Sequence, residues 1–183
     1  MFNRFLSFLM LVILSPVFLV VTFFIFCEDG FPIFFTQRRV GVNCTFFQIY
    51  KFRSMKKDTP NLATHLLLNP EKYILKTGVI LRKLSIDELP NLINILKGEM
   101  VFVGPRPALY NQDDLMQLRV RAGVDQLIPG ITGWAQVNGR DEISLEEKVR
   151  YEKEYLNRKS FWFDLKIIGL TFFEVLNSKG VNH

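Results

Sequence analysis

An apolar segment near the N-terminus places the strongest constraint on how this chain can fold. Residues 5–26 are hydrophobic except for Ser7, Ser15 and Thr22. A straight helix of this length would measure about 33 Å, close to the thickness of a bilayer's hydrocarbon core. A cleaved signal peptide fits poorly, because only Arg4 precedes the segment and no small-residue cleavage site follows it. We therefore expect a retained membrane anchor.

Ser15 and Pro16 lie in the middle of this segment. A proline inside a helix removes a hydrogen bond and clashes with the preceding turn, so a bend is expected here. One interpretation is a spanning helix that tolerates the proline. The other is a helix that bends at this point and returns to the side from which it entered. Basic residues on both flanks, Arg4 before and Arg38 and Arg39 after, favour cytoplasmic placement of both ends.

The remaining sequence is long enough for one domain with a sizeable core, because the chain has 183 residues. A formal charge of +5 and 18 phenylalanines indicate a membrane surface and anionic ligands. The basic residues are scattered and no nucleic-acid motif is present, so we do not expect a nucleic-acid partner. The two cysteines define no disulfide framework, and two distant histidines argue against a zinc site.

The region after the anchor mixes strands and helices. Residues 32–38 and 45–52 each have strand character, and turn residues at 40–43 predict a hairpin between them. The basic run 51–57 faces either solvent, lipid headgroups or phosphate. Helices are expected over residues 71–84, 112–122, 144–157 and 161–176, with a loop over 58–70. The last helix carries an apolar stripe that fits either a protein core or a membrane interface.

Residues 82–107 hold an adjacent carboxylate pair, Asp87 and Glu88. Ser85 and Glu88 have capping-box spacing, so the pair could simply start a helix. Pro90 argues against a simple cap, because a helix interior needs a backbone donor at that position, and the helix is expected to begin near Pro90 or to kink there. The apolar residues of the following run share one helical face; they are Leu89, Leu92, Ile93 and Leu96. Arg82 before the pair and Arg106 after it indicate an anion-handling site as the alternative to a cap.

A glycine-containing segment, residues 129–140, lies further along the chain. Its glycines and polar residues would let the backbone approach a ligand. The segment is neither a Walker loop nor a dinucleotide fingerprint, and an ordinary loop is the simpler interpretation of the pattern alone.

Taken together, five segments in this order resemble the bacterial sugar transferases, the monotopic phosphoglycosyl transferases. They are the apolar N-terminus with Ser15 and Pro16, KFRSM at 51–55, RKLSIDELP at 82–90, GPRP at 104–107 and GITGWAQVNGR at 130–140. The chain departs from the usual pattern at Ile86 and Asn91, where leucine and glutamine are common, and in the turn at Asn43 and Cys44. None of these departures touches the carboxylate pair.

The resemblance implies an α+β, mostly helical fold. Residues 1–28 would form a re-entrant membrane anchor. Residues 29–183 would form a catalytic domain, with a β-hairpin and interfacial amphipathic helices, on the cytoplasmic face of the bacterial inner membrane. The implied reaction moves a sugar 1-phosphate from a UDP-sugar to polyprenol phosphate and releases UMP. The form of residues 134–140 resembles members that handle N-acetylated amino or deoxyamino sugars. The product would enter O-antigen, capsule or glycoprotein glycan assembly through downstream glycosyltransferases.

The resemblance also assigns residue roles. Asp87 would be the nucleophile that forms a covalent aspartyl-phosphosugar, and Glu88 would help to hold Mg²⁺. Arg82 and Arg106 would bind phosphate oxygens, for which the guanidinium fork is suited. The nucleotide or sugar end would involve Pro105, Pro107, Gln136, Asn138, Gly139 and Arg140. Ser15 and Pro16 would form the break of the re-entrant anchor.

Two other interpretations stay open from the sequence. One is a non-enzymatic membrane module in which the carboxylates only cap a helix. The other is a polyprenyl-linked transferase that works by direct attack, without a covalent enzyme intermediate. The sequence leaves the sugar, the glycan pathway and the choice between monomer and homodimer undetermined.

Overall fold

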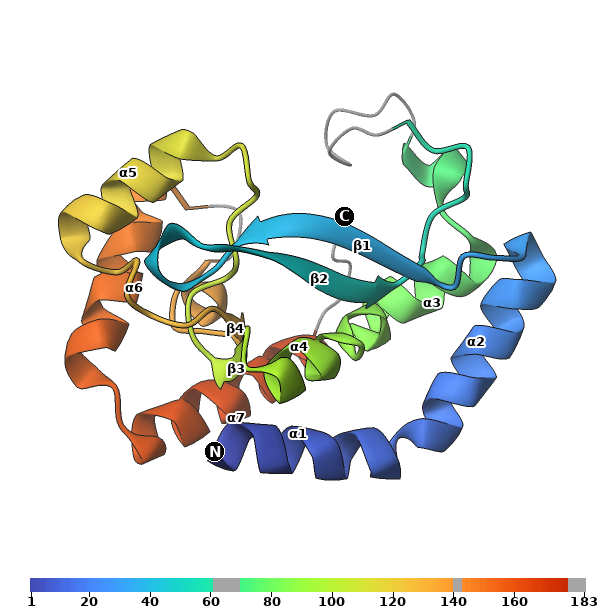
Figure 1. The fold of residues 1–183 in the computed structure, drawn as a ribbon, viewed down its shortest axis with the longest axis horizontal. Helices are drawn as coiled ribbons and strands as arrows, with labels where there is room; N and C mark the ends of the chain where they lie inside the picture. Colours follow the sequence, from blue (N-terminus) through green and yellow to red (C-terminus); the bar gives the residue numbers. More distant parts are fainter. Residues whose placement is uncertain (61–69, 140–142, 178–183) are drawn as a thin grey trace.

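The N-terminal segment of the computed structural model is two helices, α1 (Phe2–Ile13) and α2 (Ser15–Asp29). The structure describes residues 1–60, 70–139 and 143–177 (Figure 1). The helices meet at a bend of 61°. Pro16 lies in the first turn of α2, where its missing N–H is not needed, so the break falls where the sequence predicts. No single helix in the described ranges is long and apolar enough to cross a bilayer; the bent pair meets the criterion by length and composition.

The expected hairpin is present. Strand β1 (Phe34–Val40) pairs antiparallel with β2 (Phe46–Phe52), with Gln37 opposite Ile49 and Arg39 opposite Phe47. A short 3₁₀ turn, η1 (Val42–Cys44), connects the two strands. The twisted ribbon crosses the centre of the molecule in Figure 1.

The helix expected over residues 71–84 is two separate pieces. They are the 3₁₀ turn η3 (Pro70–Tyr73) and helix α3 (Lys76–Lys83). The interruption has a long-range cause, because Ile74 forms a β-bridge with Met55 and the carbonyl of Tyr73 accepts a hydrogen bond from Lys56. A pairing with residues about twenty positions earlier therefore overrides the local helical pattern.

The carboxylate pair lies in the single turn η4 (Ile86–Glu88), followed by helix α4 (Asn91–Lys97). Helix α4 ends at Gly98 with φ 87°, as its position after the last apolar residue predicts. The expected apolar face is wrong in detail, because Asn91, Leu92, Asn94 and Ile95 are buried while Leu96 is 38% exposed. Asn94 takes a core position because it bonds the hairpin: its amide donates to the Gln48 carbonyl and its oxygen accepts from Tyr50 N.

Part of the glycine-containing segment is a strand rather than a loop. Strand β4 (Gly130–Thr132) pairs in parallel with β3 (Val101–Val103), and the turn η5 (Gln136–Asn138) follows. Gly130 packs so closely on Gly104 that a Cβ would lie 2.2 Å from the Gly104 nitrogen. The glycine here serves backbone contact within the protein.

The three C-terminal helices confirm the sequence prediction. They are α5 (Asp113–Ala122), α6 (Leu145–Arg158) and α7 (Phe161–Asn177). Ser144, where the helix was expected to begin, caps α6: Glu147 N donates to Ser144 Oγ at 3.2 Å. These helices enclose one core cluster around Tyr155 and Ile167. The fold is therefore α+β and mostly helical, with two small two-stranded sheets in the described part of the chain.

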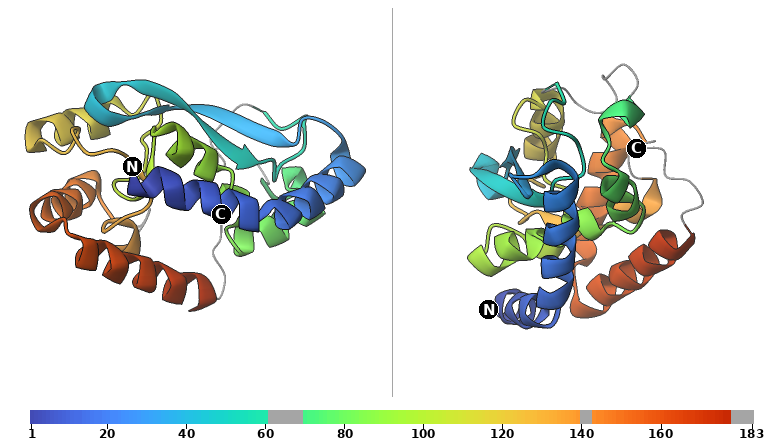
Figure 2. Two further views of the ribbon diagram at one scale, coloured as in Figure 1. Left: turned by 60° about the horizontal axis from the view of Figure 1, so that its bottom comes forward. Right: turned by 90° about the vertical axis from the view of Figure 1, so that its right-hand side faces the viewer.

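The apolar stripe of α7 faces outward. Phe161, Leu165, Ile168 and Phe172 are exposed, while Phe163 and Ile167 turn into the core. The core interpretation of the stripe is therefore wrong. Helices α1 and α7 lie along the lower face of Figure 1, which comes forward in the left view of Figure 2. This face and α2 carry most of the large aromatic side chains that are exposed in the described part of the chain.

Candidate active site

Asp87 and Glu88 do not belong to a capping box. Ser85 adopts a left-handed conformation with φ 54° and its side chain makes no capping hydrogen bond in the described structure. The turn is held by backbone bonds, from Glu88 N to the Ser85 carbonyl and from Leu89 N to the Ile86 carbonyl. A non-glycine residue held in this conformation stores strain of the kind found at functional sites. The pair therefore stands in a turn of its own between α3 and α4.

Glu88 is held by two cations. Lys51 Nζ lies 2.7 Å and Arg106 Nη2 lies 3.3 Å from the same carboxylate oxygen, Oε1. The Glu88 side chain is 20% exposed. Burial alone would raise the pKa of Glu88, but Lys51 and Arg106 outweigh it and hold this pKa well below its usual range. Glu88 is therefore ionised throughout the neutral range.

Asp87 has the opposite electrostatic character. Burial raises the pKa of Asp87 to about 6, and the neighbouring Glu88 charge adds to the effect, while Lys51 and Arg82 work against it. Asp87 is ionised at neutral pH yet poorly hydrated. A desolvated carboxylate beside cations is suited to attack on an electrophilic phosphorus.

The two arginines predicted from the sequence divide between the carboxylates. Arg106 contacts Glu88, whereas the charge of Arg82 interacts with Asp87. Arg82 is fixed from the other side, because its Nε donates to Ser54 Oγ at 2.9 Å. Ser54 belongs to the KFRSM segment, so this hydrogen bond connects two of the motifs.

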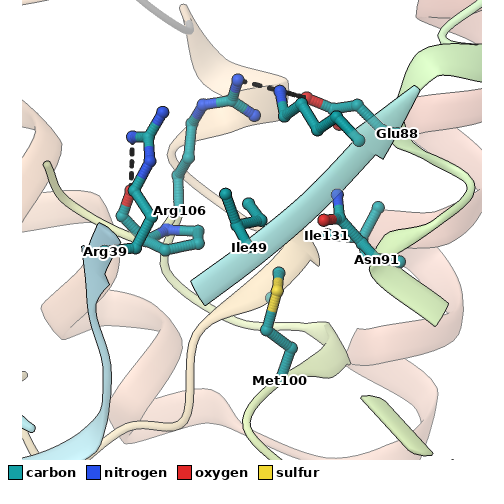
Figure 3. Close-up of a pocket in the computed structure, with 10 residues that line it drawn as sticks. Arg39, Ile49, Glu88, Asn91, Met100, Arg106 and Ile131 are labelled. Carbon is teal, nitrogen blue, oxygen red and sulfur yellow. Dashed lines mark hydrogen bonds and ion pairs between the residues drawn. The ribbon is translucent and has the colours of Figure 1, made fainter. Parts of the chain in front are cut away.

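A pocket opens beside Glu88 (Figure 3). Its lining residues come from the hairpin, η4, α4, the residues on either side of β3, and β4; they are Arg39, Ile49, Lys51, Glu88, Asn91, Met100, Arg106, Pro107, Gly130 and Ile131. In Figure 3, Ile49 and Met100 lie below the polar groups at the rim. Asn91 Oδ1 is buried in this lining without a hydrogen-bond partner among the described residues. The pocket therefore offers cations and one amide to a polar ligand.

Sequence reasoning missed two cations of this site, Lys51 and Arg39. Arg39 donates to the Pro107 carbonyl at 3.1 Å and to Gln37 Oε1 at 2.7 Å. Burial and the nearby Arg106 charge lower the pKa of Arg39 to about 10, so it remains cationic at neutral pH. Two features of the sequence could have revealed these cations. Lys51 starts the basic run, and the predicted hairpin brings residues of its strands beside the carboxylates. With Arg106, these cations outnumber Glu88 in the pocket, as a phosphate site requires.

Most of the residues predicted for the nucleotide or sugar end do not line this pocket. Pro107 lines the pocket, but Pro105 contributes its carbonyl to a hydrogen bond from Gly130 N. Gln136 and Asn138 donate within their own segment, to the Ile131 and Trp134 carbonyls. Gly139 has φ 138° and packs on Ile143, and Arg140 lies outside the described residues. Of the described residues of the GITGWAQVNGR segment, only Gly130 and Ile131 line the pocket.

A magnesium ion is compatible with this donor set. No group of three His, Cys, Asp or Glu residues that could hold a metal occurs among the described residues. Mg²⁺ is commonly bound by one or two carboxylates together with substrate phosphates and water. Both cation contacts of Glu88 fall on Oε1, so Oε2 is the oxygen that suits such an ion.

A carboxylate pair in a turn after a left-handed Ser85, with lysine and arginine around it and a bent apolar helix pair beside it, is the arrangement expected of a transferase of phosphate-bearing substrates. Residues 1–178 match the family described as bacterial sugar transferase, and the chain belongs to that family. The chain is thus an enzyme of the class that its sequence predicts.

Curated relatives agree with this assignment. An uncharacterized sugar transferase of Bacillus subtilis, EpsL, is 45% identical over 83% of this chain and 74% of its own length. The exopolysaccharide production protein ExoY of Rhizobium meliloti is 35% identical over 93% of this chain and 81% of its own. The UDP-glucose:undecaprenyl-phosphate glucose-1-phosphate transferase of Escherichia coli is 37% identical over 91% of this chain. This chain matches only 37% of that longer relative.

Proposed function

We propose that this enzyme transfers a sugar 1-phosphate from a UDP-sugar to polyprenol phosphate and releases UMP. The observation that carries the proposal is the pairing of a desolvated Asp87 with an ionised Glu88 inside a cluster of cations. Relatives named for glucose 1-phosphate and galactosyl transfer support the reaction class. They do not test the predicted N-acetylated sugar, which stays a prediction.

In the donor step, a carboxylate oxygen of Asp87 attacks the β-phosphorus of the UDP-sugar. The bond between this phosphorus and the bridging oxygen breaks, and UMP leaves with that oxygen. The sugar phosphate is then held on Asp87 as an acyl phosphate. Lys51, Arg39 and Arg106 neutralise the charge on the phosphate oxygens, which is the main requirement of phosphoryl transfer.

In the acceptor step, a phosphate oxygen of the polyprenol phosphate attacks the same phosphorus. The bond to the Asp87 carboxylate breaks, so the free carboxylate returns and a polyprenyl diphosphate sugar forms. Mg²⁺, held by Glu88 and substrate phosphates, would supply further charge neutralisation. Arg82, fixed by Ser54, favours the ionised state of Asp87 in both steps.

The exposed aromatic face supports placement of the enzyme at a membrane. The anchor, residues 1–28, would enter the bilayer through α1 and α2 and return at the bend. The outward stripe of α7 would lie at the interface, because an amphipathic helix binds there through its apolar side. Residues 29–183 would then work on the cytoplasmic face of the inner membrane, where a soluble donor meets an embedded acceptor in polysaccharide assembly.

UMP release tests this proposal. The full chain in vesicles is given Mg²⁺, polyprenol phosphate and a panel of UDP-glucose, UDP-galactose and UDP-N-acetylated sugars. We expect release with one donor, and loss of at least about 1,000-fold in Asp87→Asn because the nucleophile is gone. Asp114→Asn, on the exposed side of α5, is the matched control.

The same assay without acceptor separates the two mechanisms. A covalent intermediate predicts a burst of one UMP per enzyme from donor alone. Direct attack predicts no UMP until polyprenol phosphate is added. If Asp87→Asn released UMP as fast as the parent, the assignment of the nucleophile would be wrong.

A further inference from the structure

Ser7 of α1 makes an unusual contact for a serine in an apolar helix. Its side chain is fully buried, with 0% exposed, and its Oγ donates to the Leu92 carbonyl of α4 at 2.6 Å. A serine in such a helix commonly bonds its own preceding turn, as Ser15 does with the Val12 carbonyl at 2.8 Å. The hydroxyl of Ser7 instead connects the anchor to a helix that begins three residues after Glu88.

Arg4 reinforces this contact one turn earlier. Its Nη2 donates to the Lys97 carbonyl at 3.0 Å, in the last turn of α4, where carbonyls lack a partner within the helix. The guanidinium lies so close to Gly98 that a Cβ there would be 2.0 Å from Nη2. Helix α1 therefore makes one hydrogen bond near the start of α4 and another at the end of α4.

The second arm of the bent pair contacts the other neighbour of the carboxylates. Glu28, at the end of α2, accepts hydrogen bonds from Lys76 N at 2.5 Å and Thr77 N at 2.9 Å. Its Oε2 also accepts from Thr77 Oγ1 at 2.7 Å. These donors belong to the first turn of α3, so Glu28 does the work of an N-cap from a distant segment.

The Asp87–Glu88 turn lies between α3 and α4, and each of these helices is held by one arm of the bent pair (Figures 1 and 2). We propose that the bent helix pair is part of the catalytic framework, and that Ser7 is a positioning residue that sets α4 and thereby the carboxylate turn for the donor step. This inference rests on the proposed function. It gives the N-terminal segment a role in chemistry in addition to membrane attachment.

The short length of α4 makes the helix depend on contacts with other segments, and the Ser7 hydrogen bond is one of them. The helix has seven residues, and helices this short are not stable without tertiary contacts. Two of its buried positions are asparagines, and Asn94 bonds the hairpin, so hydrogen bonds to neighbouring segments help apolar packing to define its position. A shift of about 1 Å in a catalytic group can cost about 100-fold in rate. We therefore expect the loss of a single buried hydroxyl to be visible in the rate of the donor step.

The experiment follows the burst of UMP from donor alone, by rapid quench, with the full chain in vesicles. The donor is the UDP-sugar from the panel that the parent uses. Ser7→Ala removes the hydroxyl, and Ser7→Thr keeps it. Thr22→Ala removes a half-buried hydroxyl of α2 that makes no hydrogen bond to α3 or α4 in the described residues. Omitting the acceptor matters, because an effect on lipid access alone would leave this step unchanged.

We expect Ser7→Ala to lower the burst rate constant about tenfold, with the donor concentration for half-maximal rate within twofold of the parent. The burst amplitude stays at one UMP per chain, vesicle flotation is unchanged, and Ser7→Thr and Thr22→Ala stay near the parental rate. A parental rate in Ser7→Ala overturns the inference, as does a loss confined to amplitude, which indicates misfolded protein. An equally slow Ser7→Thr also overturns it.

The failure of the proposed function would look different. If the parent gives no burst from donor alone, the covalent step is wrong, and the comparison of Ser7→Ala with Ser7→Thr moves to kcat and KM in the complete reaction. The same tenfold fall in kcat at unchanged donor KM then supports the positioning role, and equal kcat values overturn it.

Discussion

Two neighbouring carboxylates at the candidate site have opposite electrostatic environments. Glu88 receives Lys51 and Arg106 on one oxygen and stays ionised. Asp87 is partly buried beside that negative charge, and desolvation raises its pKa to about 6. A pair whose pKa values are pushed apart by its surroundings can divide two roles, one as a fixed charge and one as a reacting group. Under the proposed function, Asp87 takes the second role.

The pH dependence of the donor step follows from this environment. Asp87 attacks only when ionised, so the rate of the UMP burst should be constant above its pKa of about 6 and fall about tenfold per pH unit below it. Burst rates measured between pH 5 and pH 8 check this. A rate that stayed level to pH 5 would show that Asp87 has the ordinary pKa of an exposed carboxylate.

Lys51 should help to set the pH below which the burst rate falls. Lys51→Met removes the cation that most lowers the pKa of Asp87, so we expect the acid limb to move up by roughly one pH unit and the rate at pH 7 to fall. The matched control is Lys56→Met, an exposed lysine of the same basic run. Equal pH profiles for the two variants would contradict the assignment of Lys51 to the site.

The local sequence pattern brought together the carboxylates and arginines of the candidate site, but it did not reveal the other cations around them. Asp87, Glu88, Arg82 and Arg106 stand close together in one contiguous stretch, so a local pattern could reveal them. Arg39 and Lys51 reach the same site only because the hairpin folds over α4, which no local pattern shows. The capping-box alternative failed for a physical reason, since the left-handed conformation of Ser85 turns its side chain away from the cap.

At the scale of elements, capping and periodicity predicted uninterrupted helices well. They failed where a segment pairs with a distant part of the chain. Helices α5 to α7 have caps and periodicity that act within a few residues, and all three were predicted. Helix α3 starts late because the preceding residues pair with Met55. Strand β4 was taken as part of a loop because its partner, β3, lies about thirty residues earlier. Contacts between distant segments therefore account for both errors.

Two helical glycines should respond in opposite ways to the same substitution. Gly78 of α3 packs on the backbone of Ser54, and a Cβ would lie 2.2 Å from its carbonyl oxygen. We expect Gly78→Ala to destabilise the protein by about 2 kcal/mol, because α3 must move away from the residues that follow β2. The shift would also loosen the hydrogen bond between Arg82 and Ser54, so UMP release should fall.

Gly169 of α7 provides the matched case, because a Cβ there meets nothing within 4 Å. Gly169→Ala should stabilise the helix by about 0.5–1 kcal/mol through its better helical propensity, with UMP release unchanged. Thermal unfolding of both variants in the same detergent checks the pair. If Gly169→Ala lowered the unfolding temperature, this side of α7 would have to pack against another surface, and the expectation of open space at Gly169 would be wrong.

At the scale of the whole molecule, the anchor and the domain share a core. Val21 and Ile25 of α2 pack with Phe52 and Leu81, and α1 packs on Leu92 and Ile95 of α4. The outer sides of α1 and α2 carry exposed phenylalanines instead. One face of each helix is therefore committed to protein and the other is suited to lipid.

The re-entrant topology makes a prediction that labelling can check. If the bent pair returns to the side from which it entered, a cysteine at Asn3 stays cytoplasmic and an impermeant thiol reagent leaves it unmodified in intact cells. Cys27 and Cys44 are both exposed, so they are first replaced by serine. Disrupted cells provide the positive control. Labelling of Asn3→Cys in intact cells would show that the segment spans the membrane.

The contacts of the bent pair also have a consequence for biosynthesis. Among the described residues, the side-chain hydrogen bonds of residues 4–29 to other segments reach no further than Lys97, whereas the cluster around Tyr155 and Ile167 needs the C-terminal helices. A ribosome therefore delivers the hydrogen-bonding partners of the bent pair before it delivers Arg106. The carboxylate turn can be framed on the nascent chain at the membrane, and the phosphate site is completed when the second half of the protein arrives.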